Sequence, residues 1–293
     1  MGNKPPKVSI IFPVRNEGKN VKMTLDSLFT VKTNIEMEAV IVDDASTDQC
    51  CHFLSHYPYR DKVTYIRTNG VGPANARNIG AARARYPYLA FCDAHMTFEN
   101  FWIDRLVFHI VKGTSDAVCP AIGSIQDPAV KGYGQSLTPS LKIKWHQKRK
   151  SLFETAVLPG ACIITSKQVF DDVGGFETGF STWGHEDVEL SLKLWLFGYR
   201  CHCDPNITVL HLFRTTHPYT VNYEGIYYNL LRMAYLHFDD KRIKKAKSLV
   251  VHGSATTIEK KVIKDGVLQK RAHYIKRRKM DIDDLFKKFN IYF

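Results

Sequence analysis

The feature that most constrains this 293-residue chain is a repeated order of short apolar runs and amphipathic segments near its N-terminus. Four runs rich in apolar residues have the length of a β-strand, at residues 8–13, 39–42, 63–67 and 88–92. Helical spacing follows at 18–29 and 72–84, and Ser46-Thr47-Asp48 offers the N-cap of another helix. Continuous apolar strands that alternate with helices predict an α/β fold, with a mainly parallel, Rossmann-like sheet flanked by helices.

The rest of the chain continues this order less regularly. Three more strands are predicted, at residues 117–121, 161–165 and 209–213. Two helices are predicted at 186–197 and 223–238 from their length and their apolar content. Between the first two of these strands, residues 123–152 mix Gly, Pro, Ser and Lys with weak periodicity, which predicts a mobile insertion.

Polar side chains follow three of the predicted strands at the point where each strand ends. They are Arg15 with Glu17, Asp43 with Asp44, and Asp93 with His95. Taken singly, an acidic residue in such a place is commonly only a turn residue. Because the carboxyl ends of parallel strands meet at one edge of a sheet, where ligands bind, the three groups together predict a binding site.

The triplet Asp93-Ala94-His95 suggests a metal site. In extended chain, residues at i and i+2 point to the same side, so a carboxylate oxygen and an imidazole nitrogen can share one ion. The triplet alone is common, but it directly follows a buried strand. His211, near the end of a later predicted strand, is a candidate third ligand, and Arg214 is a candidate cation for an anionic group.

Four motifs occur in a fixed order along the chain. They are Pro13-Val14-Arg15-Asn16-Glu17, Val42-Asp43-Asp44-Ala45-Ser46-Thr47-Asp48, Gly72-Pro73-Ala74-Asn75-Ala76-Arg77-Asn78 and Asp93-Ala94-His95. As an ordered set they resemble the GT-A nucleotide-diphospho-sugar glycosyltransferases. With the downstream motifs, the resemblance covers roughly residues 7 to 215.

This resemblance implies a nucleotide-sugar donor, most simply a UDP-sugar, and a divalent metal, Mn²⁺ or Mg²⁺. It implies that the donor is bound by residues at the strand ends and in the helix that follows the third strand. These residues are Pro13, Arg15, Glu17, Asp43, Asp44, Arg77, Asp93 and Arg214, with Asp93, His95 and His211 as metal ligands. A metal would neutralise the charge that develops on the leaving diphosphate.

Two subfamilies compete for the downstream motifs. The order Gly174-Gly175-Phe176-Glu177 and then Trp183-Gly184-His185-Glu186-Asp187 looks like the acceptor side of family-two inverting enzymes. The triplet at 93–95 and His211-Leu212-Phe213-Arg214 are also similar to polypeptide N-acetylgalactosaminyltransferases, which are retaining enzymes and typically have Asn where this chain has Asp187.

Asp187 therefore favours inversion, with this residue as the general base that takes the proton of a hydroxyl or thiol acceptor. A carboxylate in the first turn of a helix is, however, a weakened base. Glu186 is expected to orient Asp187 or to contact the acceptor, and Trp183 to stack on the acceptor. The acceptor itself, whether glycan, peptide or lipid-linked saccharide, stays open.

Charge and hydropathy suggest the organisation of the whole chain. The formal net charge is +12, and residues 239–293 hold 16 Lys and Arg against 7 Asp and Glu. We expect a catalytic domain at 1–220 and a basic helical extension at 221–293. No secretion signal or membrane span is visible, which predicts a cytoplasmic protein. The alternatives for the basic tail are a solvated helical face or a contact with anionic lipid, nucleic acid or an acidic acceptor, and peripheral contact with an anionic membrane is the one considered further.

No nucleic-acid partner is expected. A different class of function, an inactive nucleotide- or RNA-binding protein that acts through the basic tail, is a second alternative to the enzyme.

Overall fold

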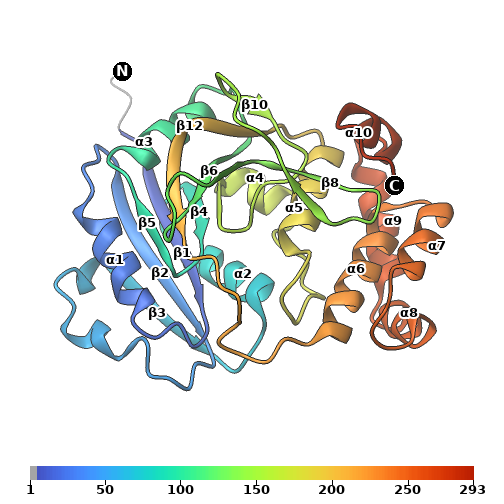
Figure 1. Ribbon diagram of the computed structural model, residues 1–293, viewed down its shortest axis with the longest axis horizontal. Helices are drawn as coiled ribbons and strands as arrows, with labels where there is room; N and C mark the ends of the chain where they lie inside the picture. Colours follow the sequence, from blue (N-terminus) through green and yellow to red (C-terminus); the bar gives the residue numbers. More distant parts are fainter. Residues whose placement is uncertain (1–4) are drawn as a thin grey trace.

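The computed structural model describes residues 5–293, and over this range a ten-stranded sheet forms the centre of the molecule (Figure 1). The strands are β1 (Lys7–Val14), β2 (Glu36–Asp44), β3 (Val63–Thr68), β4 (Tyr88–Cys92), β5 (Met96–Phe98), β6 (Ala117–Ser124), β7 (Lys131–Tyr133), β8 (Gln135–Leu137), β9 (Ile143–Trp145), β10 (Phe153–Glu154), β11 (Cys162–Ser166) and β12 (Cys201–His211). The main order is β10-β12-β6-β11-β4-β1-β2-β3, with β5 on β12 and β7 on β6. The strands β8 and β9 pair separately.

The half of the sheet built from the first four predicted strands is parallel. β1 lies between β2 and β4, and β3 pairs with the far side of β2. Val14 is in register with Asp43, so the ends of β1 and β2 lie side by side. This confirms the predicted strands and brings their terminal polar groups to one edge.

The other half of the sheet is mixed, and this brings His211 to the same edge. β11 runs antiparallel to β4 and β6, while β12 is parallel to β6. The short β5 is antiparallel to β12 and pairs His211 with Met96. The amide of Leu212 also donates to the His95 carbonyl at 3.0 Å. A strand pairing between segments more than 110 residues apart thus sets the third predicted ligand beside the second.

Helices cover both faces of the sheet, as expected for strands that are apolar on both sides. They are α1 (Asn20–Thr30), α2 (Pro73–Arg83), α3 (Trp102–Val111), α4 (Lys167–Asp172), α5 (Glu186–Leu196), α6 (Tyr223–His237), α7 (Asp240–Ser248), α8 (Ala255–Lys264), α9 (Val267–Arg277) and α10 (Ile282–Lys288). Alternation along β1 divides the core: Ile10 packs in the cluster that includes α1 and α3, and Ile11 in the cluster that includes α5 and α6.

Two local predictions were wrong. The N-cap predicted at residues 46–48 begins no α-helix, and the chain forms only short 3₁₀ turns at His52–His56 and Arg60–Lys62. Asp48 instead accepts hydrogen bonds from the Gly18 and Cys50 amides. The last strand ends at His211 instead of residue 213, so Arg214 lies in the loop that follows.

The predicted insertion at 123–152 contains short strands and packs against the body of the protein. Leu137 and Leu141 are buried there, and the indole of Trp145 lies where a side chain at Gly132 would clash with it. Its weak periodicity reflects strands of only three residues, which are too short to show alternation.

The C-terminal helices α6 to α10 gather at the end of the molecule opposite α1 and β3 (Figure 1). Their apolar side chains continue the cluster that covers one face of the sheet. All seven cysteines are buried free thiols, as predicted. Among residues 5–293, no helix combines the length and apolar character that a membrane span needs.

Candidate active site

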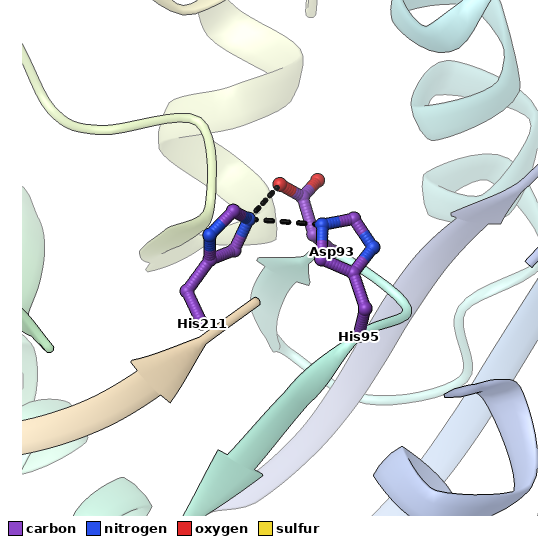
Figure 2. Close-up of side chains that lie close together, drawn as sticks. All are labelled: Asp93, His95 and His211. Atoms are coloured by element: carbon purple, nitrogen blue, oxygen red, sulfur yellow. Dashed lines mark hydrogen bonds and ion pairs between the residues drawn. The ribbon is translucent and has the colours of Figure 1, made fainter. Parts of the chain in front are cut away.

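Three side chains converge beyond the ends of β4 and β12 (Figure 2). His211 Nε2 lies 3.2 Å from Asp93 Oδ2 and 3.0 Å from His95 Nε2. One donor atom from each residue lies within 4.8 Å of the others. The structure therefore brings together the three residues predicted as metal ligands.

The spacing of these atoms suits a divalent cation. With bonds of about 2.1 Å, two ligand atoms at a right angle around an ion are about 3.0 Å apart. One carboxylate oxygen and two imidazole nitrogens form a donor set of intermediate softness, which suits first-row divalent metals. The residues present therefore fit a metal of this class.

Arg77, from α2, joins the metal cluster to the acidic start of α5. Its side chain is 5% exposed, and its guanidinium donates to Asp93 at 2.9 Å, while Glu186 lies 3.5 Å away. Burial raises the pKa of Asp93, but the His211 hydrogen bond and the charge of Arg77 outweigh burial and hold that pKa well below its usual range. Asp93 is thus a carboxylate at neutral pH.

Glu17 lies behind the cluster, in the turn after β1. Its carboxylate is buried, contacts His95 Nδ1 at 3.1 Å and forms a two-pronged ion pair with Arg214. Burial raises the pKa of Glu17, and the His95 and Arg214 contacts lower it further than burial raises it. The structure thus places Glu17 against protein groups on two sides.

A cavity of about 890 Å³ opens at this edge of the sheet. All the predicted site residues line it except Asp43, and the volume lies in the range typical of small-molecule sites. Pro13, Arg15 and Asp44 line the cavity at the ends of β1 and β2, and Trp183, Glu186 and Asp187 line it at the start of α5. The sequence motifs therefore meet around one space.

The two adjacent aspartates after β2 have different surroundings. Asp43 is 2% exposed and accepts hydrogen bonds from the Ser46 amide, the Tyr65 hydroxyl and Arg67. Asp44 lines the cavity, yet its two oxygens accept from Thr68 and from the amides of Val71 and Gly72. The structure gives Asp43 a role in holding a loop and leaves it outside the cavity.

Gly72 is required where it occurs. Its φ is 84°, and an added Cβ would lie 2.6 Å from the backbone of Ser181. The loop that leads into α2 therefore touches the segment that leads into α5, which brings Arg77 near Glu186.

The first turn of α5 carries two acids in unusual surroundings. Burial raises the pKa of Glu186 to about 7, against the opposing effect of Arg77, and Oε2 accepts from the Gly184 amide at 2.7 Å. Burial also raises the pKa of Asp187, whose oxygens accept from the amides of Gly160 at 3.1 Å and Val188 at 2.9 Å. The weakening expected from the helix terminus is therefore outweighed by burial.

The segment after β12 contributes residues that the sequence analysis missed. The Arg15 guanidinium lies over the ring of Tyr219, 5.7 Å from the centroid of that ring. The ring centroids of His217 and Trp183 are 5.0 Å apart. Trp183 is 43% exposed and lines the cavity. The sequence signal that could have found this segment is the His217-Pro218-Tyr219 cluster shortly after His211.

His185 also lines the cavity, although the sequence did not indicate it as a site residue. It caps α5 with a φ of 67°, a conformation that non-glycine residues rarely adopt, and burial lowers the pKa of its imidazole to about 4. A neutral imidazole therefore lies next to Glu186.

Similarity searches relate the chain to known proteins. The model of glycosyl transferase family 2 matches residues 9–174, and a model described as the N-terminal domain of galactosyltransferase matches residues 146–219. Polypeptide N-acetylgalactosaminyltransferase 12 of Mus musculus is 30% identical over 240 residues, which are 73% of this chain and 41% of the relative. The putative polypeptide N-acetylgalactosaminyltransferase 9 of Drosophila melanogaster is 28% identical, with 73% of this chain and 36% of the relative covered. The chain thus spans less than half the length of these relatives.

Solved structures share the fold at low sequence identity. A GalNAc-T7 structure with UDP, GalNAc and Mn²⁺ has a TM-score of 0.71 at 20% identity, over 92% of this chain and 58% of that chain. A structure of S. aureus TarS 1-349 with UDP-GlcNAc has a TM-score of 0.62 at 18% identity, over 92% and 81%. These neighbours confirm the predicted GT-A fold. The match of the family model over more than half of the sequence shows that the chain belongs to glycosyl transferase family 2.

Proposed function

We propose that this chain is a metal-dependent glycosyltransferase that takes a sugar from a nucleotide-sugar, most simply a UDP-sugar. The observation that carries the proposal is the convergence of Asp93, His95 and His211 on the wall of an 890 Å³ cavity. A divalent ion bound there would neutralise the charge of the leaving diphosphate. The relatives named as N-acetylgalactosaminyltransferases and the GT-A neighbours with UDP and Mn²⁺ support this reading.

In this proposal the nucleoside and the diphosphate of the donor lie in two different parts of the cavity. Pro13, Arg15 and Asp44, at the ends of β1 and β2, are the proposed nucleoside side. Arg77 and Arg214 lie next to the metal cluster, each paired with a protein carboxylate, Asp93 and Glu17 respectively. They are the proposed cations of the diphosphate side, since guanidinium groups recognise phosphate oxygens well.

For the stereochemistry we propose inversion, with Asp187 as general base. The two amide contacts fix the direction of its carboxylate, and burial raises its pKa, which strengthens it as a base. Glu186 is the proposed orienting group, and the exposed indole of Trp183 is the proposed acceptor contact.

A retaining transfer to a peptide is the second candidate. It is favoured by the similarity to polypeptide N-acetylgalactosaminyltransferases at 28–30% identity.

The product configuration distinguishes the two candidates. Inversion predicts that a donor of defined anomeric configuration gives a product of the opposite configuration, as measured by NMR. Retained configuration would exclude Asp187 as the base of a single displacement.

For the domain organisation we propose a catalytic part at 1–220 and a helical extension at 221–293 that supports α5 and contacts anionic membrane through its basic side chains. The observation that supports a role of the extension in holding α5 is the set of buried contacts that helices α6 and α9 make with α5. A cytoplasmic location remains a prediction from the sequence.

The activity is tested by incubating the protein with a panel of UDP- and GDP-sugars and Mn²⁺, and measuring nucleotide release. Release is expected with at least one donor, to stop with a chelator, and to be lost in Asp93→Ala. No release with any donor, with or without an acceptor mixture, would favour an inactive nucleotide-binding protein.

A further inference from the structure

Glu17 does more than line the donor cavity. Its side chain is 7% exposed and lies in the turn between β1 and α1, while its two partners come from other parts of the chain. His95 follows β4, and Arg214 follows β12. A buried carboxylate that contacts one proposed metal ligand and one proposed diphosphate cation can fix the orientation of both side chains.

We infer that Glu17 is a positioning residue that fixes the tautomer of His95 and thereby prepares the metal site. An ionised carboxylate can only accept hydrogen bonds, so the contact at 3.1 Å requires a proton on His95 Nδ1. In the neutral ring, Nε2 then carries a lone pair directed at the cluster of Asp93 and His211. A carboxylate behind a ligating histidine is a common means of orienting it.

His211 shows the opposite arrangement. Its Nδ1 is buried and has no hydrogen-bond partner within the described chain, while its Nε2 lies near both His95 Nε2 and Asp93 Oδ2. Because His95 Nε2 and Asp93 can both accept, the proton of neutral His211 belongs on Nε2 in the metal-free protein. The two histidines therefore hold opposite tautomers, and only the one held by Glu17 is ready to bind an ion.

The same carboxylate links the metal site to Arg214. The guanidinium reaches both oxygens of Glu17, so Arg214 and His95 share one carboxylate. This inference rests on the metal site of the proposed function. It adds that affinity for the metal is set in part by a residue that does not touch the metal.

The test is Mn²⁺ binding, measured by the electron paramagnetic resonance signal of free Mn²⁺, without nucleotide. Glu17→Ala is expected to weaken binding roughly 10- to 100-fold, and Glu17→Gln by less, since Gln keeps an acceptor but loses the charge. The control is Glu38→Gln. Glu38 is a buried glutamate that also pairs with an arginine, Arg85, but lies away from the cluster. Unchanged affinity in folded Glu17→Ala would overturn the inference.

A second measurement covers the case in which Glu17→Ala does not fold. Long-range ¹H–¹⁵N NMR of the metal-free protein is expected to show His95 protonated on Nδ1 and His211 on Nε2, with the His95 pattern altered in Glu17→Gln. His95 protonated on Nε2 in the wild type would contradict the inference. If the tautomers are as expected but the wild type binds no Mn²⁺, the proposed metal site fails, and only the control of the His95 tautomer by Glu17 stands.

Discussion

Two groups of charged residues, one that lines the cavity and one buried behind α5, are arranged in opposite ways. On the metal side, the side chains of Asp93, His95 and His211 are 25%, 14% and 13% exposed and turn their donor atoms toward one point. Behind the cavity wall, Glu189 and Lys193 lie one and two turns into α5 and are completely buried. The first group directs its donor atoms toward the cavity, whereas the second group pairs its charges within the protein.

The buried group behind α5 is a network of complementary charges. Glu189 accepts from Lys193 at 3.1 Å and from His237 at 2.9 Å, and Lys193 also donates to the Gly175 carbonyl at 2.7 Å. Nearby, Glu177 pairs with Arg232 at 2.9 Å. The comparison shows that α5 is fixed from behind by buried polar contacts, which include His237 of α6, while its first turn lines the cavity.

The largest effect is expected from a substitution that tests Asp187, in the first turn of α5, as the general base. Asp187→Asn keeps the size of the side chain but removes its ability to take a proton. We expect kcat to fall by about 10²- to 10⁴-fold with little change in the donor KM. Steady-state kinetics check this, with the exposed Asp171→Asn as control. A loss below about tenfold would place the acceptor base elsewhere.

The second prediction breaks the buried network. Lys193→Met leaves the Glu189 carboxylate buried with His237 alone, so the free energy of unfolding should fall by about 3–5 kcal/mol. The matched control is Lys22→Met, which removes an exposed ion pair of the same four-residue spacing and should cost under about 1 kcal/mol. Urea unfolding measures both. Equal losses would show that burial does not distinguish the two pairs.

The third prediction concerns how the stability of the protein depends on pH through Glu186, in the first turn of α5. Because burial raises the pKa of Glu186 to about 7 from 4.5, the folded chain holds this proton more tightly than the unfolded chain. Its contribution to stability is therefore present at low pH and is lost as pH rises toward 7. Glu186→Gln should be more stable than wild type by about 3 kcal/mol near pH 8 and equal to it near pH 4. A pH-independent difference in urea unfolding would contradict this.

The smallest expected effect concerns the rim of the cavity. Trp183→Ala removes an exposed ring that lies against the ring of His217, so the acceptor KM should rise about 3- to 10-fold with kcat largely kept. Phe108→Ala, an exposed aromatic on α3 outside the cavity, is the control. Equal effects of the two substitutions on the acceptor KM would remove Trp183 from the acceptor site.

The same comparison shows what the sequence could predict. The strands at the metal side were predicted because each is a continuous apolar run, and their terminal polar groups meet since parallel strands end at one edge. His211 could be proposed from its place near the end of a predicted strand, but its closeness to His95 could not, because that depends on the pairing of β12 with β5 across the chain. Asp43 and Asp44 could not be told apart, since their roles depend on Arg67 and Gly72 in later segments.

The buried network could not be predicted. Glu189 and Lys193, four residues apart, have the spacing of an ordinary surface pair on a helix. Their burial is decided by α6 and α9, which bring His237 and the ring of Tyr274 over them. The raised pKa of Glu186 likewise comes from burial that local sequence does not report.

Mn²⁺ binding in the presence of UDP tests most directly whether Asp93, His95 and His211 form the metal site of a nucleotide-sugar transferase. Titration followed by electron paramagnetic resonance should show one Mn²⁺ per wild-type chain, bound more tightly with UDP. Asp93→Ala should bind at least 100-fold more weakly, by estimate from the loss of a charged ligand. Wild-type affinity in a folded Asp93→Ala variant would contradict the account.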